Sequence, residues 1–199
     1  IITGPMFSGK TTELIRIAKK YQSINKKILA INYSRDTRYD EEAAIFSHDK
    51  EKFSSTLALD SLDNLLKETS VELIKNSDII LIDEVQFFRG SFEIIKTLVE
   101  DFNKVVIVSG LDGDYLQNPF GDVCKLIAFA DKLTRLNAIC KIGQEYTDAS
   151  FSRRIVKSDL TELIGSNDIY IAVSRGMYNL PEDQFQKLII SHSQEQLDI

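Results

Sequence analysis

Two stretches of this sequence carry side chains that could do phosphate chemistry. The first is a G-x-x-x-x-G-K-T pattern made of Gly4, Pro5, Met6, Phe7, Ser8, Gly9, Lys10 and Thr11, with Thr12 next in the chain. In such a loop the backbone N–H groups surround a nucleotide's phosphates, the lysine reaches the β- and γ-phosphates, and the threonine hydroxyl can hold Mg²⁺. The pattern predicts that a nucleoside triphosphate binds at Gly4 to Thr12.

The second stretch is the carboxylate pair Asp83-Glu84, which directly follows the apolar run 79–82. In phosphate-loop proteins an aspartate at this point holds Mg²⁺ directly or through water. An adjacent glutamate can take a proton from an attacking hydroxyl or water. The pair therefore predicts the metal and proton-transfer half of the same site.

Both stretches need strands and helices that hold them in place. Ile1 and Ile2 read as the end of a strand, and residues 12–21 read as a helix with an apolar face. The apolar runs 27–33, 79–82 and 104–110 read as buried strands of a parallel sheet. In such a sheet ligands sit beyond the carboxyl ends of the strands, so Asp36 and Arg38 in one loop and residues 111–121 in another should border the site.

The alternation of strands and helices predicts an α/β fold, a phosphate-loop NTPase-type parallel sheet with helices on both faces. Three further segments are predicted to be helices: 61–69, 91–103 and 123–132. Residues 133–139 are predicted to be a further strand. The alternation of strand and helix stops in about 140–180, where two short strands are expected on either side of a polar, glycine-containing loop. We therefore expect a kinase-type domain at 1–138, a small domain at 139–180 with a lasso-like loop, and a polar tail at 181–199.

Composition narrows the class of protein. The chain has 199 residues and a net charge of −6, with no long basic run, which disfavours nucleic acid as a partner. No stretch is apolar enough to span a bilayer, so a membrane is not expected as a partner. The two cysteines, Cys124 and Cys140, give no disulfide framework, and a reducing cytoplasm is the expected compartment.

Six segments taken together resemble one family, the type II (cytosolic, phosphate-loop) thymidine kinases. The segments are 4–14, Asp36-Thr37-Arg38-Tyr39, Ser47-His48-Asp49, 83–88, Gly110-Leu111-Asp112-Gly113 and Pro119-Phe120-Gly121. Their order and spacing match over about residues 1–180. The resemblance implies transfer of the γ-phosphate of ATP to the 5′-hydroxyl of thymidine, with deoxyuridine as a second acceptor, giving dTMP and ADP for nucleotide salvage and DNA synthesis.

The resemblance also implies roles for particular residues. Glu84 matches the catalytic base, Lys10 and Arg38 match the residues that neutralise phosphate charge, and Thr11 and Asp83 match the Mg²⁺ ligands, with Asp36 as a further candidate. The positions that match the thymidine pocket and its lasso are Met6, Phe87, Leu111, Tyr115, Phe120, Arg154, Leu163, Ile164, Gly165 and Tyr170. The family also implies a homotetramer and feedback inhibition by dTTP.

One departure from the family concerns zinc. The family's small domain usually holds a structural Zn²⁺ with two C-x-x-C pairs, which match Cys140, Gly143, Ser174 and Met177 here. Only one of the four ligands remains, and tetrahedral structural zinc needs four. We expect no structural zinc, so the lasso must be held by packing, by subunit contacts, or less firmly than in the family.

Three other functions stay open on the sequence. A phosphate-loop ATPase acting on a macromolecule would use Glu84 to activate water, but it predicts a basic groove. A GTP-dependent switch protein needs an Asn-Lys-x-Asp segment, and the segments 25–28 and 103–106 both lack the aspartate. A degenerate kinase kept for regulation fits the lost zinc ligands but not the intact Lys10, Thr11 and Glu84.

Overall fold

A six-stranded parallel sheet forms the centre of the larger part of the molecule. The computed structural model describes residues 1–34, 44–46, 52–54, 57–143, 147–156 and 169–197. The strand order is β5-β2-β6-β7-β1-β8, and every neighbouring pair runs parallel. The strands are β1 (Ile2–Thr3), β2 (Ile28–Tyr33), β5 (Leu57–Leu59), β6 (Ile79–Ile82), β7 (Val105–Gly110) and β8 (Thr134–Arg135). The predicted parallel sheet is confirmed.

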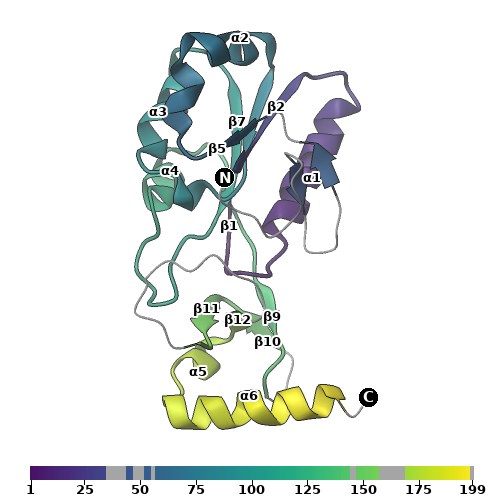
Figure 1. The fold of residues 1–199 in the computed structure, drawn as a ribbon, viewed down its shortest axis with the longest axis vertical. Helices are drawn as coiled ribbons and strands as arrows, with labels where there is room; N and C mark the ends of the chain where they lie inside the picture. The colour runs from purple at the N-terminus through teal and green to yellow at the C-terminus, as the bar shows by residue number, and fades with distance from the viewer. Residues whose placement is uncertain (35–43, 47–51, 55–56, 144–146, 157–168, 198–199) are drawn as a thin grey trace.

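Helices cover both faces of this sheet (Figure 1). Helix α1 (Lys10–Gln22) lies on one face, and α2 (Glu68–Asn76), α3 (Ser91–Glu100) and α4 (Val123–Phe129) lie on the other. The strand β6 shows why both faces are apolar: Ile80 and Ile82 pack toward α3 and α4, whereas Ile79 and Leu81 pack toward α1. Successive side chains of a strand point to opposite faces, so a continuous apolar run is what a doubly covered strand requires.

Two of the predicted elements differ in detail. Ser61 caps its helix as expected, since its hydroxyl accepts the N–H of Asp63, but the helix is a 3₁₀ turn, η1 (Leu62–Leu66). The α-helix begins only at Glu68, because Lys67 is extended. The predicted strand 133–139 is divided between β8 of the large sheet and β9 (Ala138–Cys140) of the small domain.

The division has a structural cause at Leu136. Its N–H donates to the carbonyl of Thr3 at 2.8 Å, and its own carbonyl lies against Gly4 so closely that a Cβ there would be 2.3 Å away. The chain therefore crosses over the start of the phosphate loop and then leaves the sheet. Gly4 has φ 143, which together with this contact excludes a side chain.

Among the residues described below the large sheet, short two-stranded sheets and two helices form the small domain. Strand β9 pairs antiparallel with β10 (Thr147–Ala149), and β11 (Phe151–Arg154) pairs antiparallel with β12 (Tyr170–Val173). Helices α5 (Arg175–Tyr178) and α6 (Glu182–Leu197) follow, and α6 runs across the far end of the molecule (Figure 1). A further antiparallel hairpin, β3 (Ala44–Phe46) with β4 (Lys52–Ser54), packs beside α1.

The small domain has its own apolar core. Ala138, Cys140, Ile142, Ala149, Ala172, Val173 and Phe185 are buried there, and α6 contributes Phe185 together with the partly buried Leu188 and Ile189. The tail at 181–199, expected to be polar and partly helical, thus packs through α6 on the small domain. The three-part division of the chain at 138 and 180 stays a prediction. Among the described residues, no helix is long and apolar enough to cross a membrane.

Candidate active site

The phosphate loop joins β1 to α1. Helix α1 begins after Gly9, which has no side chain to cap the helix, so the N–H groups of its first turn face the loop. The buried Lys10 returns into the loop, where its Nζ donates to the carbonyl of Pro5 at 2.7 Å. The hydroxyl of Ser8 donates to the same carbonyl at 2.8 Å. The loop therefore gathers N–H donors, a helix N-terminus and an ammonium group around one point, which suits a phosphate.

The middle of the loop contacts the small domain. The N–H of Met6 donates to the hydroxyl of Ser152 on β11 at 2.9 Å, and Ser152 is buried. Phe7 has φ 62 and packs against the apolar core of the small domain. The loop that would hold the donor is thus braced by β11 and by the apolar core around it.

Asp83 stands at the end of β6, and several donors contact its carboxylate. The hydroxyl of Ser109 and the N–H of Glu84 both donate to its Oδ1, the latter at 3.0 Å, and the Thr11 hydroxyl lies near enough to lower its pKa. Burial, followed by the negative charge of Glu84, raises the pKa of Asp83 to about 6 despite these bonds. A carboxylate and a hydroxyl in contact are oxygen ligands of the kind that Mg²⁺ prefers.

Glu84 follows in an uncommon backbone conformation. Its φ of 53 and ψ of 43 place it in the left-handed region, directly before the 3₁₀ turn η2 (Val85–Phe87). A residue other than glycine is strained there by the order of 1–3 kcal/mol, and such strain clusters at functional sites. The turn directs the Glu84 side chain toward Gln86, whose Nε2 donates to Glu84 Oε2 at 2.6 Å.

Gln86 connects the carboxylate to a neighbouring loop. Its side chain is buried, and its Oε1 accepts the N–H of Leu111 at 3.1 Å. Leu111 begins the loop 111–121 that follows β7. Both ends of the Gln86 amide are therefore engaged, which fixes the amide orientation and with it the position of Glu84 Oε2.

Aromatic rings gather beside this carboxylate. Phe87 stacks on Tyr33 with ring centroids 5.1 Å apart and meets Phe120 edge-on at 5.5 Å. Phe88, the next residue, is fully buried and packs edge-on against Tyr33. Of the two phenylalanines, Phe88 is a core residue, and Phe87 is the one that remains partly exposed at the site.

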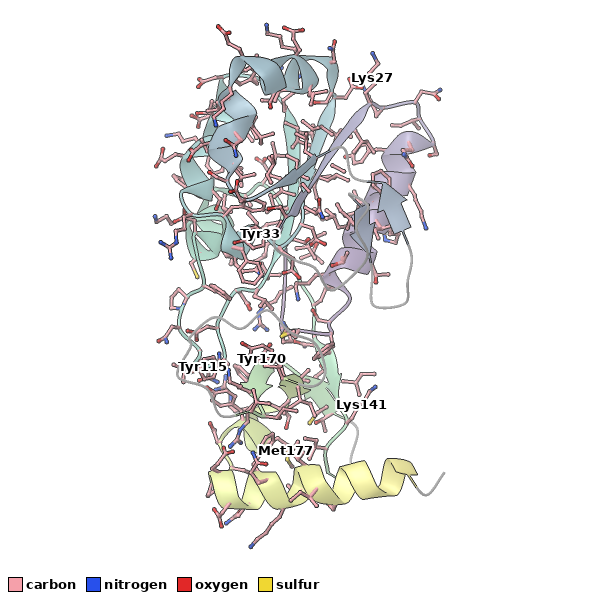
Figure 2. The ribbon with its side chains drawn as sticks, in the orientation of Figure 1. Lys27, Tyr33, Tyr115, Lys141, Tyr170 and Met177 are labelled. Carbon is pink, nitrogen blue, oxygen red and sulfur yellow. The ribbon has the colours of Figure 1, made fainter. Side chains whose placement is uncertain are left out.

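A second group of side chains joins the loop 111–121 to the small domain. The buried guanidinium of Arg154 lies over the ring of Tyr115, with Cζ 3.8 Å from the ring centroid. Its Nη2 donates to the hydroxyl of Tyr170 at 3.1 Å. Figure 2 shows Tyr115 and Tyr170 between the large sheet and α6, whereas Tyr33 lies higher, at the end of β2.

The geometry has the parts of a nucleotide kinase, and comparison with known proteins identifies which kind. The family model described as thymidine kinase matches residues 1–178. The chain belongs to the thymidine kinase family. It is therefore a kinase, and its function is the phosphorylation of thymidine in nucleotide salvage.

Members of the family from distant sources align along most of this chain. Thymidine kinase 1 of Dictyostelium discoideum is 41% identical over 187 residues, which cover 92% of this chain and 78% of that protein. The thymidine kinase of sheeppox virus (strain KS-1) is 39% identical, and the alignment covers 90% of this chain and 96% of the viral protein. The thymidine kinase of vaccinia virus (strain Western Reserve) is 38% identical, and the alignment covers 89% of this chain and 94% of the viral protein.

Solved structures give a more distant likeness. A structure of AMPPCP-bound DnaA from Aquifex aeolicus matches with a TM-score of 0.41 and 15% identity, covering 68% of this chain and 39% of that one. A crystal structure of a DNA replication initiation factor matches with the same TM-score and identity, covering 68% of this chain and 38% of that one.

With the family established, the site residues expected from the sequence can be placed. The structure brings Thr11, Asp83 and Glu84 together, and it gathers Phe87 with Phe120, and Tyr115 with Arg154 and Tyr170. Leu111 takes part through its N–H. Asp36, Arg38, Leu163, Ile164 and Gly165 lie outside the described residues.

The sequence alone assigns no functional role to four residues that the structure of this thymidine kinase places at or beside the site: Tyr33, Gln86, Ser109 and Ser152. Ser109 could have been found, because Ile82 lies opposite Val108 in the parallel pair β6–β7, which puts Asp83 beside Ser109. Tyr33 ends β2, the strand next to β6, and thus shares the same sheet edge. Nothing in the sequence indicates that Ser152 meets Met6, because 146 residues separate them.

Proposed function

We propose that this thymidine kinase transfers the γ-phosphate of ATP to the 5′-hydroxyl of thymidine, giving dTMP and ADP, with Glu84 as the catalytic base. One observation carries the assignment: Asp83 lies beside the Thr11 hydroxyl of the phosphate loop and accepts the N–H of Glu84 at the same time. The donor half and the acceptor half of the reaction therefore meet at a single buried carboxylate.

Residues of the phosphate loop, 4–12, bind the ATP phosphates. In phosphoryl transfer the protein contributes positioning and charge stabilisation more than covalent chemistry. Lys10 is already inside the loop, and its ammonium can exchange the Pro5 carbonyl for a β- or γ-phosphate oxygen. Arg38 is the second cation that we assign to the transferring phosphoryl group.

Thr11 and Asp83 are the residues that would hold Mg²⁺, with Asp36 as a further ligand. Their hydroxyl and carboxylate groups lie near each other, and a hard cation favours such oxygen ligands. Bound Mg²⁺ supplies positive charge to the phosphate oxygens. Asp83 would then be ionised, because a cation favours the charged form of a carboxylate.

Glu84 takes the proton of the 5′-hydroxyl as the O–P bond forms. Its Oε2 accepts a hydrogen bond from Gln86, which holds the carboxylate toward the acceptor side. The nucleoside binds beyond it, between Phe87 and Phe120 on one side and Tyr115, Arg154 and Tyr170 on the other. The loop 111–121 carries residues of both groups, so it shapes the pocket from both sides.

The remaining parts of the assignment follow the family. Met6 borders both the ATP and the thymidine, and Leu163, Ile164 and Gly165 belong to the lasso over the base. Deoxyuridine is a second acceptor, dTTP is a feedback inhibitor, the enzyme is a homotetramer, and it works in the cytoplasm. Neither nucleic acid nor a membrane is needed by this chemistry.

A coupled assay tests the proposal. Purified protein is given ATP and Mg²⁺ with each natural nucleoside in turn, and ADP release is measured. We expect turnover with thymidine and deoxyuridine and little with purine nucleosides. ADP release that does not depend on a nucleoside would support an ATPase and contradict the proposal.

A further inference from the structure

Arg153 holds together several chain segments of the small domain. Its Nη1 donates to the carbonyls of Met177 and Tyr178 at 2.7 and 3.1 Å, which are the last two residues of α5. Its Nη2 donates to the carbonyl of Leu180 at 3.1 Å and to a carboxylate oxygen of Glu182 at 2.9 Å. One guanidinium thus ties β11 to the end of α5 and to the start of α6.

The environment of Arg153 makes these bonds strong. Its side chain is only 11% exposed, and its Cζ lies 3.7 Å from the ring centroid of Phe185, which is fully buried. A planar guanidinium can serve several acceptors in its plane while an aromatic ring covers its face. Two of the carbonyls it binds, those of Met177 and Tyr178, are at the C-terminal end of a helix, where carbonyls need such a partner.

The next residue on β11 is Arg154, on the opposite face of the strand. Consecutive strand residues point to opposite sides, so Arg153 faces the helices while Arg154 faces Tyr115 and Tyr170 of the acceptor pocket. The direction of one arginine therefore determines the direction of the other.

Tyr178 closes the connection from the other side. Its N–H donates to the carbonyl of Ser174, its carbonyl accepts from Arg153, and its hydroxyl donates to the carbonyl of Tyr115 at 2.8 Å. The ring of Tyr115 in turn lies against Arg154. Arg153, Tyr178, Tyr115 and Arg154 thus form a closed circuit of contacts, which we call the Arg153 circuit.

The positions that match the family's zinc ligands lie in this same region and do not fit a metal. Cys140 is buried in the apolar core, Ser174 caps α5 through the N–H of Met177, and a Cβ on Gly143 would lie 3.3 Å from Met177 Cε. These side chains offer one cysteine sulfur in place of four ligands. Something other than zinc must connect β9, β12 and α5.

We propose that Arg153 is a positioning residue for the acceptor pocket, and that the Arg153 circuit with the docked helix α6 does in this chain what a structural metal does elsewhere. The proposal rests on the acceptor pocket assigned above. Arg153 does not touch the substrate. It fixes the position of the thymidine side of the site through Tyr178, the loop 111–121 and Arg154.

Steady-state kinetics of two variants test the kinetic part. Arg153→Met keeps an apolar stem on Phe185 but removes every guanidinium bond, and Tyr178→Phe removes only the hydroxyl. We expect each to raise the KM for thymidine about tenfold, which corresponds to about 1.4 kcal/mol. The KM for ATP should change less than threefold, because Lys10, Thr11 and Asp83 are outside the circuit. Arg153→Lys should rescue little, since an ammonium cannot reproduce the planar fork.

The two changes should also be non-additive. Each breaks the same circuit, so the double variant should be no worse than the worse single variant. Arg175→Ala is the matched control, because Arg175 is an exposed arginine of the same domain whose guanidinium lies 4.5 Å over Phe151. Glu182→Gln is a second control, as that carboxylate is 58% exposed and its ion pair should contribute little. Both controls should leave the thymidine KM within twofold.

Hydrogen exchange gives a test that does not depend on activity. In Arg153→Met the amides of 111–121 and 151–154 should exchange faster, while those of α2 and α3 should not change. Three results would overturn the proposal. In the first, the increases in the thymidine KM caused by the two single changes multiply in the double variant. In the others, all kinetic constants worsen equally, or the amides of 111–121 exchange at the wild-type rate. If Arg153→Met does not fold, an unchanged thymidine KM in Tyr178→Phe overturns it. A wild-type enzyme inactive on thymidine would defeat the proposed function instead, and the exchange result would still decide the circuit.

Discussion

The side-chain amide of Gln86 lies between the carboxylate of Glu84 and the backbone of Leu111, with Nε2 2.6 Å from Glu84 Oε2 and Oε1 3.1 Å from the Leu111 nitrogen. An amide held at both ends cannot rotate without losing a bond. The proposed base is therefore aimed by a buried residue that is itself fixed by the loop on which the nucleoside rests.

Replacing Gln86 should lower turnover more than binding. Gln86→Met keeps the volume of the side chain but lets Glu84 move, and a misplacement of about 1 Å can cost about 100-fold in rate. We expect kcat to fall about 10- to 100-fold while the KM for thymidine changes less than threefold. Gln22→Met, at the exposed end of α1, is the control. A kcat within twofold of wild type would remove Gln86 from this role.

Asp83 should destabilise the metal-free fold at neutral pH. Its pKa is raised from its ordinary value near 4 to about 6, chiefly by burial, so between these values the folded chain keeps a proton that the unfolded chain has lost. Stability then falls as pH rises through this window, and the cost above pH 6 is about 3 kcal/mol. Asp83→Asn carries no such charge.

Chemical denaturation in the presence of EDTA measures this effect. Asp83→Asn should be more stable than wild type by about 1–3 kcal/mol at pH 8, and the difference should shrink as the pH falls from 6 toward 4. The same variant should be inactive, and Mg²⁺ with ATP should stabilise wild type more than the variant. A stability difference that is the same at pH 8 and pH 4 would show that Asp83 does not titrate as described.

The small domain should contain no zinc. Metal analysis of the purified protein should find well below one zinc per chain, and a zinc chelator should leave activity unchanged. The three substitutions Gly143→Cys, Ser174→Cys and Met177→Cys, made together with Cys140 kept, should create a site that binds one zinc. Met177→Cys removes the methyl group that crowds Gly143, and the φ of 99 at Gly143 costs only about 1–3 kcal/mol against the roughly 10–16 kcal/mol of structural zinc. Stoichiometric zinc in the wild-type protein would contradict this prediction.

Ser152 should affect the donor side, although it lies in the small domain. Ser152→Ala leaves the partly buried Met6 N–H without its 2.9 Å acceptor, and a donor that burial leaves without any partner costs about 1–3 kcal/mol. We expect the affinity for a non-hydrolysable ATP analogue, measured by calorimetry, to fall about threefold to tenfold. Ser150→Ala, whose hydroxyl makes an exposed bond to Asn137, is the control. Equal affinities for the two variants would show that Ser152 does not brace the loop.

Much of this site could be predicted from the sequence, because its main parts are local. The phosphate loop needs contiguous residues at fixed spacing, and Asp83-Glu84 follows an apolar run that can only be a buried strand. Strand ends of a parallel sheet share one edge, so the loops after β2, β6 and β7 could be assigned to the site without coordinates.

The parts that could not be predicted depend on contacts between distant residues. The chain leaves the sheet at Leu136 because of its packing on Gly4, which no periodicity in 133–139 indicates. Likewise, the contacts of Arg153 and Tyr178 depend on where α5 and α6 dock, which no local pattern in the sequence indicates. The two-part helix at 61–76 escaped prediction because one extended residue, Lys67, separates its halves.

The measurement that tests the central assignment most directly is single-turnover formation of dTMP by Glu84→Gln, with ATP and Mg²⁺ saturating and thymidine binding measured in parallel. Gln is close to Glu in size but cannot accept the 5′-hydroxyl proton, so we expect thymidine affinity within about threefold of wild type and a transfer rate lower by a factor of about 100 or more. A transfer rate near that of the wild type would contradict the account, because the proton would then leave by another route.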